Sequence, residues 1–198
     1  MMKTHVTYLM RSGQMSQTTK KALAASLKKL LKKSTLDKIT VKDIAEDCEV
    51  NRQTFYYHFQ DVYALLEWIF MTDAQQVISG NKTYDTWQQG FLEVFKYVEE
   101  NSEFVVNTYH SIGREHLERY LYSTVFGLLI DVVNEQAVGM NVREEDRNFI
   151  ADFYKYAFVG LMLEWIRTGM KERPEEIVDK LDKLISGDVH RALCKYAH

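Results

Sequence analysis

Apolar residues recur at three- and four-residue intervals along most of the chain, which predicts a series of amphipathic helices. A first helix is expected from Ser16, a residue type that caps helices, to about Lys33, with lysines between its leucines. Two short helices joined by a tight turn fill 40–59, and a fourth helix spans 62–79, with Asp61 as its cap. Further helices are expected over 86–99, 102–111, 115–135, 144–169 and 174–188. The predicted fold class is therefore all-α.

Each of the two short helices begins after a residue that can cap it, and the outer face of the second helix is strongly polar. Thr40 can cap the first helix, with Asp43 as its reciprocal partner, and Asn51 can cap the second. Phe55 and Phe59, spaced i and i+4, supply the inward face of the second helix. The outward positions are rich in hydrogen-bonding groups: Arg52, Gln53, Thr54, Tyr56, Tyr57 and His58. Such a face indicates a polar partner, and DNA fits it.

The composition supports this helical reading. The 198 residues are 46% hydrophobic and include one proline and nine glycines, which argues against a loop-rich or all-β architecture. Cys48 and Cys194 lie far apart and are expected to be reduced thiols. Neither a signal peptide nor a continuous apolar run of about 18 residues is recognisable. We therefore expect a cytoplasmic protein without a membrane-spanning segment.

Charge is divided unevenly between the two ends of the chain. Residues 1–61 contain 11 Lys and Arg residues against six Asp and Glu residues, whereas the remaining 137 contain 14 and 22. This asymmetry indicates that the basic N-terminal part, residues 1–61, approaches a polyanion and that the acidic remainder does not. A simpler alternative is that the lysines only solvate one helix face. The predicted organisation is an extension at 1–15, a helix-turn-helix domain at 16–61, and a partner-binding and dimerisation domain at 62–198.

An enzyme or a metal-binding protein would be an alternative to a DNA-binding one. The chain has no Ser/His/Asp pattern, no phosphate-cradling glycine loop and no HExxH motif, so we predict no catalytic residues and no enzyme activity. Two pairs of zinc-ligand residue types remain, His190 with Cys194 at i and i+4 and His110 with His116, but no dense CxxC or HExxH arrangement accompanies them. We predict neither a metal site nor a cofactor.

Residues 39–65 resemble the DNA-binding region of the TetR family of bacterial transcriptional regulators. The matching positions are Thr40, Ile44, Ala45, Val50, Thr54, Tyr56, His58, Phe59 and Leu65. The resemblance implies a homodimer, joined through two long helices at about 149–169 and 174–188, and a ligand cavity enclosed by the middle helices. It also implies contacts with double-stranded operator DNA from Thr40, Asn51, Arg52, Gln53, Tyr56, Tyr57 and His58.

The chemistry of these positions suggests how the contacts divide. Arg52 and Gln53 suit the bidentate reading of guanine and adenine edges in a major groove. Tyr56, Tyr57 and His58 are expected to position the helix against phosphates, as are Thr40 and Lys42. For Tyr56, packing of the ring in the core is an equally weighted alternative. Aromatic residues that could line an effector pocket, or equally form core, are Trp87, Phe91, Phe95, Tyr109, Tyr122, Phe126 and Tyr154.

Within the family, 37–70 and 165–177 are similar to the branch associated with dihydroxyacetone kinase operons. This similarity implies a switch operated by a small-molecule effector or a protein co-activator. Because related members respond to zinc, a zinc-responsive regulator of the same fold is an alternative. Two positions depart from the family pattern, because Glu49 replaces a common turn glycine and Val62 replaces a phosphate-contacting lysine. These departures keep open an adaptor that has lost its DNA affinity.

Overall fold

The computed structural model describes residues 2–78, 83–111 and 113–197, with side chains described from Ser16 onward except at 74–82. In these ranges the secondary structure consists of helices and no strands, which confirms the predicted all-α class. The chain forms two compact units. Unit 1 comprises 1–70 and 103–117, and unit 2 comprises 71–102 and 118–198. The segment boundaries predicted from the sequence, at 15 and 61, concern function and stay predictions.

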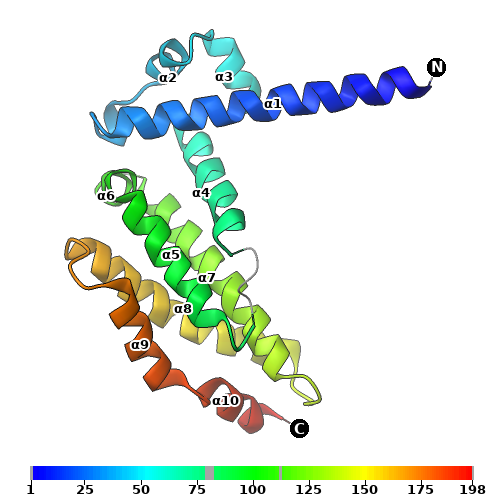
Figure 1. Ribbon diagram of the computed structural model, residues 1–198, viewed down its shortest axis with the longest axis vertical. Helices are drawn as coiled ribbons and strands as arrows, with labels where there is room; N and C mark the ends of the chain where they lie inside the picture. The colour runs from blue at the N-terminus through cyan, green and yellow to red at the C-terminus, as the bar shows by residue number, and fades with distance from the viewer. Residues whose placement is uncertain (1, 79–82, 112, 198) are drawn as a thin grey trace. The chain divides into compact units, whose positions relative to one another are not determined.

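Unit 1 is built on the long helix α1 (Met2–Leu31), against which α2 (Val41–Asp47) and α3 (Arg52–His58) pack (Figure 1). A short 3-10 turn, η1 (Leu36–Lys38), precedes α2. The first part of α4 (Val62–Ile78), α6 (Ser102–Tyr109) and the start of α7 (Arg114–Gln136) complete the unit. Its core consists of side chains that are at most 4% exposed: Leu23, Leu27, Leu31, Leu36, Ile44, Phe55, Leu65, Leu66, Phe70, Phe104 and Val105.

The start of α1 corrects one prediction. We expected Ser16 to cap the first helix and 1–15 to lie outside it, but α1 already begins at Met2. Residues 2–15 contain no proline, and extending an existing helix costs far less than nucleating one. The leucine stripe farther along α1 can therefore sustain helix upstream of Ser16. The segment between the helices expected at 62–79 and 86–99 lies partly outside the described residues.

Unit 2 contains α5 (Trp87–Glu100), α8 (Glu144–Arg167), α9 (Pro174–Ile185) and α10 (Asp188–Tyr196), together with the ends of α4 and α7. Helix α9 packs against α5, and α10 packs against α8 (Figure 1). The expected last helix therefore ends earlier than 188, at Ile185, and a separate helix follows it. The break falls at Gly187, whose φ of +78° lies in the left-handed region that glycine adopts without steric strain.

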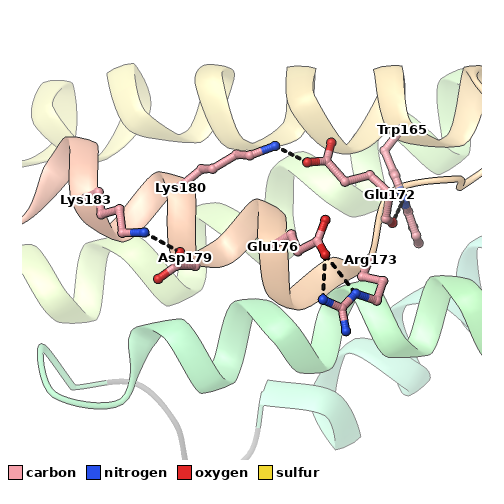
Figure 2. Close-up of polar contacts among 7 residues, drawn as sticks. All are labelled: Trp165, Glu172, Arg173, Glu176, Asp179, Lys180 and Lys183. Atoms are coloured by element: carbon pink, nitrogen blue, oxygen red, sulfur yellow. Dashed lines mark hydrogen bonds and ion pairs between the residues drawn. The ribbon is translucent and has the colours of Figure 1, made fainter.

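Several interactions fix the connection between α8 and α9 (Figure 2). The indole Nε1 of Trp165 donates to the backbone carbonyl of Glu172 at 2.8 Å, and the Glu172 carboxylate pairs with Lys180. Arg173 pairs with Glu176 through Nε at 2.9 Å. Pro174 occupies the first turn of α9, as predicted, where a missing N–H costs nothing. The two helices are thus joined by a short, well-bonded turn.

No helix in the described part of the chain is both long and apolar enough to cross a membrane.

Candidate DNA-binding interface

The start of α2 is fixed by a complete capping box, as the sequence predicts. Thr40 Oγ1 accepts a hydrogen bond from the Asp43 backbone N–H at 3.3 Å, and Asp43 Oδ2 accepts one from the Thr40 N–H at 2.8 Å. The Thr40 hydroxyl also donates to Asp43 Oδ2 at 2.7 Å, and this bond together with the one from the Thr40 backbone N–H lowers the pKa of Asp43. Lys42 is exposed next to them and pairs loosely with Glu46, at 3.7 Å. Thr40 and Lys42 therefore lie on the solvent side of the first turn of α2.

Helix α3 begins in the same way. Asn51 Oδ1 accepts hydrogen bonds from the backbone N–H of Thr54 at 2.8 Å and from its hydroxyl at 3.0 Å, which confirms the predicted cap. Because the Asn51 cap satisfies an N–H group that would otherwise lack a partner, it stabilises a helix of only seven residues. Arg52 and Gln53 follow directly and are both exposed.

The inner and outer faces of α3 are sharply different. The predicted inward residues Phe55 and Phe59 are 0% and 6% exposed, and their rings lie 5.9 Å apart. Tyr56 and Tyr57 are 57% and 83% exposed. For Tyr56 this exposure excludes the alternative of a core role, although its ring edge contacts Phe55. The outer face of α3 is therefore available to a partner.

His58 is half-buried near the end of α3, between the Tyr57 and Phe59 rings. Burial, and to a lesser extent the charge of Lys20, lowers the pKa of its imidazole. The lowered pKa favours the neutral imidazole of His58 near pH 7. A neutral imidazole can still donate one hydrogen bond to a phosphate oxygen, although it adds no positive charge.

Two lysines of α1 support this interface and were not singled out from the sequence. Lys20 Nζ lies 5.6 Å from the ring centre of Phe59 and 5.9 Å from that of Trp68, where a cation–π interaction is favourable. Lys29 Nζ pairs with Asp47 of α2 at 2.6 Å. Both belong to a run of lysines at helical spacing, and sequence periodicity alone does not tell which of them contact neighbouring helices.

The two departures from the family pattern have different structural consequences. Glu49, at the turn between α2 and α3, has a φ of +55°, so a side chain occupies a conformation that favours glycine. Val62 is only 9% exposed and packs inward at the start of α4. Asp61 caps this helix by accepting from the Ala64 N–H at 2.8 Å, as predicted. The turn is thus strained but formed, and a phosphate contact from position 62 is absent.

Family models match both ends of this architecture. Residues 18–69 match the model of bacterial regulatory proteins of the tetR family. Residues 85–187, more than half of the chain, match a C-terminal region of transcriptional regulators. The chain belongs to the TetR family. It is therefore a DNA-binding transcriptional regulator and not an enzyme, as predicted.

Individual relatives of this TetR-family protein agree with the assignment. The chain is 28% identical over 179 residues to the HTH-type dhaKLM operon transcriptional activator DhaS of Lactococcus lactis subsp. lactis strain IL1403, covering 89% of this chain and 90% of that protein. A solved structure of a dihydroxyacetone kinase operon activator DhaS has a TM-score of 0.68 and 25% identity, covering 91% of this chain and 98% of that one.

A TetR transcriptional regulator from Streptococcus agalactiae 2603V has a similar fold, with a TM-score of 0.57 and 18% identity, covering 96% and 99% of the two chains. The predicted resemblance to the family, and to its dihydroxyacetone kinase branch, is confirmed as a resemblance.

The aromatic residues considered for an effector pocket separate into three groups. Trp87, Phe91, Phe95 and Tyr109 are at most 7% exposed and form core. Tyr122 and Phe126 surround the ammonium group of Lys155, at 5.7 and 5.4 Å from their ring centres. Tyr154 lines a pocket between α8 and α10. Among the residues whose structure is described, no group of three or more His, Cys, Asp or Glu side chains could hold a metal ion.

Proposed function

We propose that this protein is a homodimeric regulator of a dihydroxyacetone kinase-type operon, located in the cytoplasm and switched by a small-molecule effector or a protein co-activator. The observation that carries the operon assignment is the similarity to DhaS over 89% of the chain, including both the DNA-binding and the C-terminal regions. A match confined to residues 18–69 would support only the DNA-binding function, because this region is common to the whole family.

DNA reading is assigned to the exposed residues of α2 and α3. Arg52 and Gln53 would contact base edges, since they are exposed at the beginning of a helix held in place by two buried phenylalanines. Thr40, Lys42, Tyr56, Tyr57 and His58 would contact phosphates and fix the register of the helix. Asn51 already uses its side-chain oxygen as a cap, so only its amide N–H groups remain for DNA.

The exposed apolar face of α8 supports the homodimer. Tyr156 and Leu161 are 60% and 45% exposed, and Leu184 of α9 is 73% exposed. Phe149 and Phe153, which are 60% and 64% exposed, extend the apolar face of α8 towards α10. A contiguous apolar face of this kind usually marks a protein–protein interface. In a two-fold dimer, α8 and α9 would meet their counterparts, and the two recognition helices would reach half-sites about 34–36 Å apart. The dimer could adopt conformations that differ in the distance between its two DNA-binding regions. An effector would act by binding one of these conformations more tightly than another.

The experiment is a mobility shift with the DNA upstream of the dihydroxyacetone kinase genes of the source genome. Arg52→Ala or Gln53→Ala should each cost about 1–3 kcal/mol at one base pair of each half-site and reduce discrimination there. Lys42→Gln should weaken binding to all sequences alike and reduce the salt dependence of affinity. Lys183→Gln, an exposed lysine of α9, is the matched control.

Binding to this DNA that is unaffected by both Arg52→Ala and Gln53→Ala would refute the assignment of the reading helix. Specific binding to another operator only, with both variants defective, would refute the operon assignment alone. Weak binding without salt dependence would instead indicate the adaptor that the departures at Glu49 and Val62 keep open. Leu161→Glu tests the dimer separately, because a charge on the α8 face should shift sedimentation towards the monomer.

A further inference from the structure

A pocket of about 420 Å³ lies between α8 and α10, within the range of about 300–1,000 Å³ that holds small molecules in proteins. Its α8 wall is formed by Phe149, Ile150, Phe153 and Tyr154, and its α10 wall by Asp188, Arg191, Ala192, Lys195 and Tyr196. Both helices belong to unit 2. The cavity that the family resemblance implies is enclosed by the middle helices, so this pocket is a different one.

The two walls offer different chemistry. The α8 wall is aromatic and aliphatic, and the Phe153 and Tyr154 rings meet edge to face at 5.4 Å. The α10 wall carries two cations four residues apart, which places both on one face of the helix. Arg191 is paired with Asp188 at 3.3 Å, so the wall retains one net positive charge next to an apolar surface.

We propose that this pocket binds a small organic anion with an apolar body. The body would lie against Phe153, Tyr154 and Tyr196, and its carboxylate, sulfonate or phosphate group would lie between Arg191 and Lys195. Burial and the nearby Asp188 charge raise the pKa of Tyr154, so its phenol stays protonated and can donate a hydrogen bond to an anion. An uncharged ligand would leave the net charge of the α10 wall uncompensated.

A second copy of the chain is the competing occupant, because Phe149 and Phe153 border both the pocket and the exposed face of α8. The composition of the α10 wall favours the small anion. Charged side chains are depleted at the core of protein interfaces, whereas Asp188, Arg191 and Lys195 all open into this pocket. The site can therefore stay open at the edge of a dimer that uses Tyr156, Leu161 and Leu184.

The full-length protein is titrated with 1-anilinonaphthalene-8-sulfonate, an aromatic anion whose fluorescence rises in apolar sites. N-phenyl-1-naphthylamine, which has the same ring system without the sulfonate, is the neutral control, and decanoate tests an aliphatic body by displacement. Ala192→Leu should remove the site by filling it. Lys195→Gln should weaken the sulfonate probe by roughly two- to fivefold, as expected for an exposed charge, and leave the neutral probe unchanged. Lys183→Gln on α9 should change neither probe.

Equal affinity of the sulfonate probe for the original chain, Ala192→Leu and Lys195→Gln would overturn the proposal. Displacement of the probe as sedimentation shows self-association would also overturn it, because a second copy would then fill the pocket. Melting temperature and operator binding of each variant verify that the chain has folded. Probe affinity and melting temperature do not depend on the operon assignment, so the two proposals can fail independently.

Discussion

Asn51 caps the start of α3 and is proposed to contact DNA, and these two roles can be separated by substitution. Its side-chain oxygen accepts a hydrogen bond from the Thr54 N–H at 2.8 Å, and the residue is exposed at the N-terminal end of the helix proposed to read DNA. Asn51→Ala removes the cap and should lower the free energy of unfolding by about 1 kcal/mol, within the usual range of about 0.5–2 kcal/mol. Asn51→Ser and Asn51→Asp retain an oxygen acceptor of comparable capping strength, so both should melt close to the original chain.

DNA affinity should order the same variants differently. Asn51→Asp keeps the cap but brings a negative charge to the phosphates, so its operator affinity should fall most steeply at low salt. Asn51→Ser should lose only what the amide N–H groups contribute. Asn51→Ala should lose up to about fivefold if the frayed helix must refold on DNA, since 1 kcal/mol corresponds to that factor.

The assays are urea unfolding followed by circular dichroism and mobility shifts at two salt concentrations. Equal stability of Asn51→Ala and the original chain would refute the capping role. Unchanged affinity of Asn51→Asp at low salt would show that position 51 does not face DNA, and the proposed docking of α3 would then be wrong.

Three further predictions concern the turn at Glu49, the half-buried His58 and the connection between α8 and α9. Glu49→Gly relieves a positive φ of +55° and should raise the free energy of unfolding by up to about 1 kcal/mol, measured by urea unfolding, with tighter operator binding because a negative charge is lost. Because the pKa of His58 is lowered in the folded protein, the unfolded chain binds a proton at a higher pH than the folded one does. The free energy of unfolding should therefore fall as the pH drops from about 6.5 to the pKa of folded His58. His58→Gln should flatten this part of the pH profile. Trp165→Phe leaves the Glu172 carbonyl without its donor at 2.8 Å and should cost about 1–3 kcal/mol in thermal melts, with no effect expected for Lys183→Gln.

The sequence was most informative where one local interaction decides the structure. The caps at Thr40, Asn51 and Asp61 need only side chains within three residues of the helix start, and all three are formed. The inward positions Phe55 and Phe59 follow from helical spacing in the same way. The predicted start of α1 at Ser16 was wrong. No residue before Ser16 interrupts the helix, and a residue type that can cap a helix does not end one when it lies inside it.

What the sequence could not predict depends on contacts between helices that lie far apart in the chain. In the sequence Lys20 cannot be distinguished from its neighbouring lysines. Only the packed structure shows that its ammonium group lies over the Phe59 and Trp68 rings. Tyr154 resembles a core aromatic until α10 packs against α8 and leaves space between them. In both cases the residue type was visible, but its partner was set by tertiary packing.

The same distinction explains why the DNA-reading face can be assigned while the effector cannot. A helix that binds DNA must expose its hydrogen-bonding side chains. The exposed side chains of Arg52, Gln53 and Tyr57 therefore indicate the class of partner directly. An effector site must enclose its ligand, and residues that enclose a ligand are of the same types as those that form a core. Charge breaks this ambiguity, because a cation beside an apolar cavity has no core role to explain it. Lys195 and Arg191 are therefore the residues whose substitution tells most about what unit 2 binds.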